Sequence, residues 1–209
     1  MKRISVVFIA VLVLFITVSA DAQNRIGFIG GLNLANVSVD PEETGIEYSN
    51  RTAFGGGSVV DLRLAENIAL QLEPMFLQKG AKVKEDGSGH NMKVKLSYIE
   101  VPLLLKLMLG QSTICPYIMA GPSVGFRLSA KVSNGVERDV KDVTKSTDFG
   151  LDFGAGISFP AGNGAIFAEG RYGLGLSQIN DDPEDPNTDV KNKGIQFMAG
   201  ITFPLSGGQ

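Results

Sequence analysis

The side chains of this sequence that could do chemistry are mostly carboxylates and cations that stand singly within apolar stretches. Six carboxylates and four cations are mostly flanked by apolar residues. An isolated charge in an apolar environment is costly, so these groups must pair with one another or hold water. Six against four is close to balance. The ten residues are Asp61, Arg63, Glu73, Glu100, Lys106, Arg127, Asp148, Asp152, Glu169 and Arg171.

The sequence has few residues that could form other kinds of reactive site. The single histidine, His90, follows Ser88 by two residues, so a Ser–His nucleophile is conceivable, but a solvated loop is the simpler interpretation. Cys115 is the sole cysteine and cannot form an internal disulfide. The acidic stretch 181–189 could attract a divalent cation but lacks the EF-hand spacing. The sequence therefore predicts no catalytic residue, no cofactor and no metal site.

The charged residues lie in segments with strand signals. Long polar connections alternate with short ones rich in turn-forming residues. This alternation is typical of outer-membrane barrels, in which tight turns face the periplasm and long loops face outward. The expected strands are 25–37, 51–64, 68–79, 93–109, 115–131, 146–159, 165–179 and 194–203. The long connections are 38–50, 80–92, 132–145 and 180–193, and the short ones are 65–67, 110–112 and 161–164.

Apolar and polar side chains alternate within these segments. In 146–159 the odd positions from Phe149 to Phe159 are apolar, whereas the even positions hold Asp148, Asp152, Gly and Ser. A period of two indicates strands with two unlike faces. The polar face is built mainly of small residues with few charges, which suits a narrow lumen better than a water-exposed surface. We therefore expect the aliphatic face to contact lipid; a soluble barrel with the faces reversed is the alternative.

In such a barrel the charged residues would line the lumen, where two interpretations compete. They could form a polar conduit for protons or ions, or a plug of salt bridges that closes the bore. Eight strands leave little free bore, which favours the plug. The pairs Glu100 with Lys106 and Glu169 with Arg171 are the first to test by substitution. The expected lumen network comprises Glu73, Glu100, Lys106, Arg127, Asp152, Glu169 and Arg171.

The first segment is a targeting signal. Lys2 and Arg3 precede an apolar run over 4–18, and Ala20-Asp21-Ala22 forms an A-x-A cleavage pattern. The run is shorter than the roughly 20 residues that a spanning helix needs. We expect 1–22 to be a cleaved signal peptide of the Sec pathway and 23–209 to be the barrel domain.

Charge and export together define the expected partners. The chain has 19 Lys and Arg against 22 Asp and Glu, a formal net charge of −3. A nucleic-acid surface needs concentrated positive charge, so nucleic acid is not an expected partner. The expected partners are outer-membrane lipid and lipopolysaccharide, the barrel-insertion machinery and, as a further candidate, secretion-system components.

Several motifs resemble one family. GGLNLAN at 30–36 looks like the opening strand of the PorT-like outer-membrane β-barrel proteins of Bacteroidetes-type bacteria, often labelled "porin family". LQLEPMFLQKG at 70–80 resembles their third strand, and YIEVPLLLK at 98–106 resembles their most specific strand. Pro116-Tyr117 and Ala120-Gly121-Pro122 continue the similarity. The resemblance implies an eight-stranded outer-membrane barrel without known catalytic residues.

The expected fold is thus all-β: an eight-stranded antiparallel up-and-down transmembrane barrel, exported to the outer membrane. Three functions are open. The first is a non-enzymatic integral barrel with a structural, adhesion or secretion-linked role, whose long loops carry recognition. The second is a narrow porin-like channel for small solutes. The third is a soluble secreted barrel that binds an apolar ligand.

Overall fold

The computed structural model describes residues 24–41, 45–85, 91–110 and 113–205. The expected signal peptide, Ser88 and His90 lie outside these ranges. No helix within them is long and apolar enough to cross a membrane. The strands are β1 (Arg25–Asp40), β2 (Ile46–Ser49), β3 (Arg51–Ala65), β4 (Ile68–Leu72), β5 (Met75–Lys79), β6 (Lys82–Glu85), β7 (Asn91–Met108), β8 (Cys115–Ser133), β9 (Glu137–Asp139), β10 (Thr147–Ala161), β11 (Gly164–Gly175) and β12 (Asp189–Pro204), and η1 (Lys141–Val143) is a 3-10 helix.

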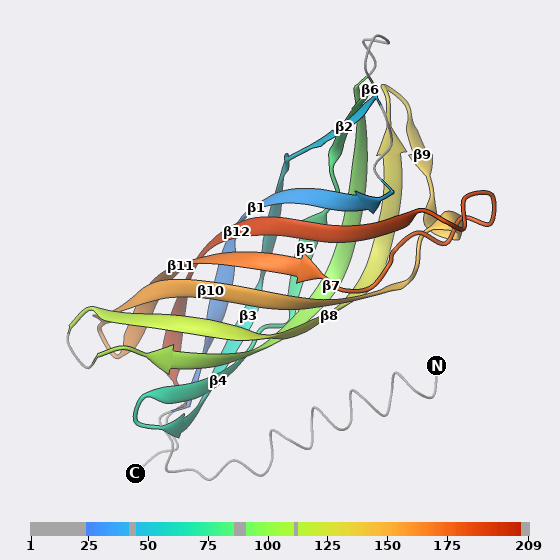
Figure 1. Ribbon diagram of the computed structural model, residues 1–209. Helices are drawn as coiled ribbons and strands as arrows, with labels where there is room; N and C mark the ends of the chain where they lie inside the picture. The colour runs from blue at the N-terminus through green and yellow to red at the C-terminus, as the bar shows by residue number, and fades with distance from the viewer. Residues whose placement is uncertain (1–23, 42–44, 86–90, 111–112, 206–209) are drawn as a thin grey trace.

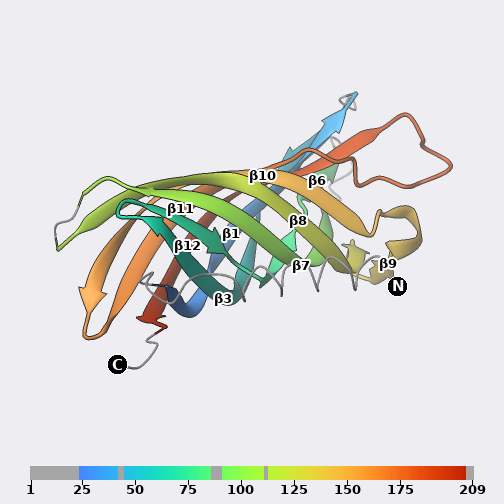
Figure 2. The same ribbon diagram turned by 90° about the horizontal axis from the view of Figure 1, so that it is seen from below.

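The strands form one antiparallel sheet that closes on itself. β1 pairs with β3 on one side and with β12, the last strand, on the other. Around the ring the order is β1, β3, then β4 and β5 in line, β7, β8, β10, β11 and β12. Figures 1 and 2 show these tilted strands winding around a common axis. Closure leaves the strands of the ring without open edges.

The strands are divided more finely than the sequence predicts. Each of the eight expected segments carries strand, but the third breaks between β4 and β5 at Glu73-Pro74. Proline has no N–H for the ladder, which explains the break. Short strands β2, β6 and β9 occupy parts of three connections that we expected to be loops. The all-β antiparallel prediction is confirmed, whereas the described residues form twelve strands rather than the eight expected.

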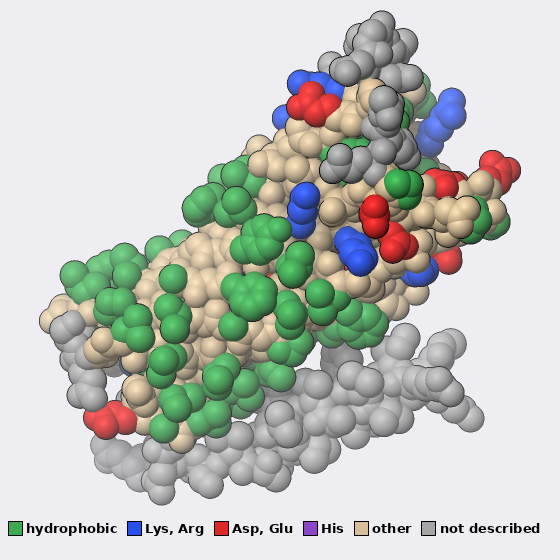
Figure 3. All heavy atoms as spheres, in the orientation of Figure 1, with side chains coloured by type: hydrophobic (Ala, Val, Ile, Leu, Met, Phe, Trp, Pro, Cys, Tyr) green, Lys and Arg blue, Asp and Glu red, His purple; other side chains and the backbone are tan. Residues whose placement is uncertain are grey.

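The two faces of the sheet differ as the alternation predicts. Large apolar side chains point outward, and Phe28 and Phe197 are 69% and 56% exposed. Asp148 and Asp152, on the opposite face, are each 2% exposed. Figure 3 shows hydrophobic side chains spread over the outer surface, with charged ones gathered near β6 and β9. The prediction that the aliphatic side chains point away from the barrel axis is confirmed.

The interior is less polar than the sequence suggests. Besides the charged residues it holds several apolar clusters, which fill space that small residues alone would leave open. The largest comprises Ile29, Val59, Met75, Leu77, Phe167 and Met198. The charged side chains therefore lie between packed apolar groups, where each needs a partner.

Candidate functional site: charged networks across the bore

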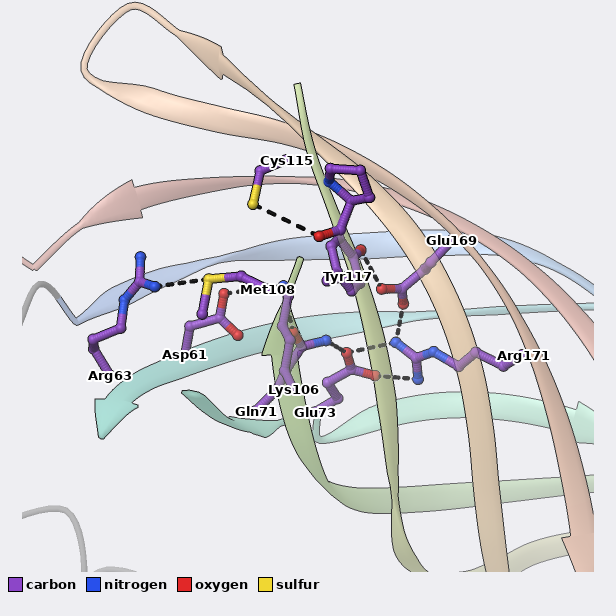
Figure 4. A network of polar contacts seen from close by, with 11 residues as sticks. Asp61, Arg63, Gln71, Glu73, Lys106, Met108, Cys115, Tyr117, Glu169 and Arg171 are labelled. Atoms are coloured by element: carbon purple, nitrogen blue, oxygen red, sulfur yellow. Dashed lines mark hydrogen bonds and ion pairs between the residues drawn. The ribbon is translucent and has the colours of Figure 1, made fainter. Parts of the chain in front are cut away.

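One buried network centres on Arg171. Arg171 and Glu169 lie two residues apart on β11, so both side chains face the interior. The Arg171 guanidinium donates to both carboxylate oxygens of Glu73, at 2.5 Å each, and also to Glu169. The Tyr117 hydroxyl donates to the second oxygen of Glu169 at 2.7 Å. Figure 4 shows these groups pointing toward one another. A bidentate Arg–carboxylate pair is among the stronger hydrogen-bonded contacts.

The same network continues toward the short turns. The Gln71 amide donates to Glu73, and the Lys106 ammonium donates to Gln71 at 2.9 Å. Lys106 also lies 3.5 Å from Asp61 and 4.0 Å from the centre of the Tyr117 ring, a cation–π distance. We call this set the Arg171 network. It comprises Asp61, Gln71, Glu73, Lys106, Tyr117, Glu169 and Arg171.

The Arg171 network joins opposite walls of the ring. Glu73 lies between β4 and β5, and Arg171 lies on β11. Between these positions stand β3, β1 and β12 in one direction, and β7, β8 and β10 in the other. A direct ion pair between them therefore crosses the bore. Both side chains are almost fully buried, with 1% exposure for Arg171 and 0% for Glu73.

A second network centres on Lys79 at the end of β5. Its ammonium lies 2.5 Å from Glu100 and 3.1 Å from Asp148. The Asn192 amide donates to Asp148 at 2.9 Å and to the Tyr98 hydroxyl at 3.4 Å. Because Tyr98 lies on β7 and Asn192 on β12, this contact also joins opposite walls. The Lys79 network comprises Lys79, Tyr98, Glu100, Asp148, Ser177 and Asn192.

Five of the seven expected network residues belong to these two sets. Glu73, Lys106, Glu169 and Arg171 belong to the Arg171 network, and Glu100 belongs to the Lys79 network. Asp152 is buried and lines a cavity of about 20 Å³ together with Lys79 and Glu100. Arg127 donates to the backbone carbonyl of Lys145 at 3.1 Å, and no ion pair links it to another described residue.

The two expected pairs have different outcomes. Glu169 and Arg171 are in contact. Glu100 and Lys106 have other partners, Lys79 for the carboxylate and Asp61 for the ammonium. Both lie on β7 and point inward, but six residues of strand separate them by about 20 Å. Their expected pairing was therefore wrong.

Six members of the networks were not among the charged residues expected in the lumen: Gln71, Lys79, Tyr98, Tyr117, Ser177 and Asn192. For two of them the segment 68–79 carries a signal. Gln71 and Lys79 share the odd numbering of Glu73, so the same alternation places them on the inner face. Tyr117 was assigned to the inner face but without a polar role. Asn192 lies in a stretch that we expected to be a loop, where no face could be assigned.

A larger cavity opens at the end with the short turns. Its volume is about 430 Å³, and its lining includes Arg25, Arg63, Lys106, Cys115 and Tyr117. Its inner side is formed by members of the Arg171 network. Within the described part of the chain no three His, Cys, Asp or Glu side chains gather as they would around a metal ion. Among the described residues the geometry supports ion pairing across the bore.

Comparisons with known proteins agree with this architecture. Residues 21–181 match the family model described as outer membrane protein beta-barrel domain. Among solved structures, Neisserial surface protein A is 16% identical with a TM-score of 0.54, over 88% of this chain and 97% of that one. OprG from Pseudomonas aeruginosa is 15% identical with a TM-score of 0.51, over 89% and 97%. At these identities the likeness shows the fold alone.

A third similar structure is the outer membrane protease OmpT from Escherichia coli, 9% identical with a TM-score of 0.49, over 90% of this chain and 98% of that one. No curated protein sequence matches. Because the family model covers well over half of the sequence, the chain belongs to the outer membrane protein beta-barrel family and resides in the outer membrane.

Proposed function

We propose that the mature chain is a non-enzymatic transmembrane barrel whose bore is plugged and whose long connections carry recognition. The barrel has eight strand positions around its ring, and β4 and β5 together fill one of them. A structural, adhesion-linked or secretion-linked role fits such a barrel, because its outward-facing connections are the part that a partner can reach.

The observation that carries this proposal is the ion pair between Arg171 and Glu73. The two residues come from opposite walls, and two hydrogen bonds of 2.5 Å join them. A solute would have to separate these buried charges, and breaking a buried pair by removing one partner costs about 3–5 kcal/mol. The Lys79 network adds a second crossing through Tyr98 and Asn192. Two such barriers in series favour closure over transport.

The narrow channel is the second candidate, and the cavity of about 430 Å³ favours it. This cavity could be the entrance of a pore whose gate is the Arg171 network. The third candidate, a soluble barrel with an apolar ligand, conflicts with the outer-membrane location.

Conductance in planar lipid bilayers separates the first two candidates. The wild type should insert without discrete current steps, whereas a variant that removes both crossings should show small ones. That variant carries Glu73→Ala, Tyr98→Ala, Glu169→Ala, Arg171→Ala and Asn192→Ala. The variant confirms that insertion is detectable, and a gel with and without boiling confirms that each barrel is folded. Regular current steps from the folded wild type would contradict the plug.

The finer assignments from the sequence also belong to this proposal. The strand at 98–106 supports a PorT-like subfamily, and the A-x-A pattern supports cleavage after Ala22. Amino-terminal sequencing of protein extracted from outer membranes should begin at Gln23. An uncleaved Met1 would refute the signal peptide while leaving the barrel intact.

A further inference from the structure

The part of the sheet farthest from the short turns carries a cluster of outward-facing lysines. Val83, Leu96 and Ala130 are buried on the inner face of β6, β7 and β8. Because side chains alternate along a strand, the residues beside them point outward. Figure 3 shows charged side chains at this end of the molecule. The outward lysines on these three strands are Lys82, Lys84, Lys93, Lys95 and Lys131.

The strand register places lysines directly opposite each other. Lys82 faces Lys93 across β6 and β7, and Lys95 faces Lys131 across β7 and β8. Side chains at opposite positions have Cβ atoms roughly 4.5–5.5 Å apart, and like charges there are destabilising. Lys84 differs from the other four, because Glu47 lies opposite it. Two like-charged pairs therefore need negative charge from elsewhere.

One of these pairs has its counter-charge within the chain. Glu137 on β9 accepts hydrogen bonds from Lys95 at 2.6 Å and from Lys131 at 3.1 Å. These two bonds lower the pKa of the Glu137 carboxyl. A single anionic group thus bridges two lysines that the register brings together.

The other pair has no such bridge. No carboxylate among the described side chains forms an ion pair with Lys82 or Lys93. Instead, Ser49 on β2 lies opposite Lys82, and Ser133 on β8 lies opposite Lys93. Four neighbouring strands therefore present the row Ser49, Lys82, Lys93, Ser133 on the outer face. The two ammonium groups can only donate hydrogen bonds, and the two flanking hydroxyls can donate as well as accept. The row can therefore present four donor groups to a compact anion.

The row lies just beyond the apolar belt. Ile99 on β7 and Leu128 on β8 point outward and are 38% and 49% exposed. Lys93 is six residues from Ile99, which is about 20 Å along the strand and, at a tilt near 45°, about 14 Å along the membrane normal. The row therefore lies on the polar side of the outward apolar residues of β7 and β8, toward the headgroup region.

We propose that Lys82 and Lys93, with Ser49 and Ser133, bind a phosphate group of a lipid A headgroup in the outer leaflet. The phosphate would bridge these lysines as Glu137 bridges Lys95 and Lys131. A phosphate monoester suits the row because it brings up to two negative charges and three acceptor oxygens. The inference rests on the proposed orientation, in which the long connections face outward.

The test uses the midpoint of the heat-induced gel shift of the full mature chain in vesicles. Phosphatidylcholine vesicles are compared with the same vesicles containing lipid A, containing phosphatidylglycerol, or supplemented with inorganic phosphate. Lipid A should raise the wild-type midpoint, and the other two additions should not. The variant with Lys82→Gln and Lys93→Gln should lose most of this rise. Lys193→Gln is the matched control, because this outward lysine lies opposite Asn36, and it should keep the rise.

A second variant reverses the charge of one lysine in the pair. Lys93→Glu replaces the like-charged pair with an opposite-charged one, so it should raise the midpoint in phosphatidylcholine alone and abolish the response to lipid A. An unchanged response in the double glutamine variant would overturn the inference, as would an equal rise with phosphatidylglycerol or inorganic phosphate. Labelling of Ser133→Cys from outside intact cells tests the orientation separately. Failure of that labelling would reject the proposed orientation, not the lysine geometry.

Discussion

Replacing Arg171 with Met tests how strongly the Arg171 network holds the barrel together. Methionine keeps a long side chain but removes the charge that joins Glu73 and Glu169. The structure leaves both carboxylates buried, with 0% exposure for each side chain. Removing one partner of a buried ion pair costs about 3–5 kcal/mol, and here two carboxylates lose the same partner. We expect a loss at the upper end of that range.

The assay is urea unfolding of barrels refolded into vesicles, followed by the folded fraction on unboiled gels. A triple variant with Arg171→Met, Glu73→Gln and Glu169→Gln removes all three charges together and should regain much of the loss, because no unpaired charge remains. Glu137→Gln removes an exposed ion pair and is the control, with an expected loss of only about 0.2–1 kcal/mol. A loss below about 1 kcal/mol for Arg171→Met would refute the argument that buried charge pairing stabilises the barrel.

Phe197→Arg should destabilise the barrel in vesicles by about 2–4 kcal/mol, because the side chain faces lipid near mid-strand; Phe197→Leu should not, and equal stability of the two variants would contradict this. Gly27→Ala should cost about 1–3 kcal/mol, since the new Cβ would lie 1.8 Å from a backbone carbonyl oxygen, whereas Gly170→Ala meets nothing within 4 Å and should be tolerated in the same urea assay. Hydrogen bonds from two lysines lower the pKa of Glu137. Its contribution to stability should therefore be present above the usual pKa of a free Glu and vanish as the pH falls through the lowered value. An NMR titration of this carboxyl that gives an ordinary pKa would disprove the bridge. Cys115, which lines the cavity at the short turns, should react with a maleimide supplied from the periplasmic side and not from outside intact cells.

The sequence was sufficient to predict the faces of the strands. Alternation in 146–159 placed Asp148 and Asp152 on the inner side, where both are buried, and Phe149 on the outer side. This works because the pleat repeats every two residues whatever lies in the neighbouring strands. Short turns were equally visible, and β3 and β4 meet at 66–67 as expected.

Partners across the bore could not be predicted in the same way. Glu100 meets Lys79 rather than Lys106, because contact depends on the register and tilt of separate strands. The missing N–H of Pro74 is a sequence signal for the break between β4 and β5. The partner that Glu73 meets at this break depends on the strands on the opposite wall. Short strands such as β6 and β9 look like loops in sequence, because they are polar and gain their order from pairing with β7 and β8.

The central claim is that the aliphatic face of the barrel contacts hydrocarbon while the opposite face is closed. Spin labels placed one at a time along 195–199 of β12 test it directly, through collision rates with oxygen, which concentrates in lipid, and with a water-soluble nickel complex. We predict high oxygen access at Ile195, Phe197 and Ala199, and low access to both reagents at Gln196 and Met198. High access to the nickel complex at Phe197, or no alternation along the strand, would contradict the account.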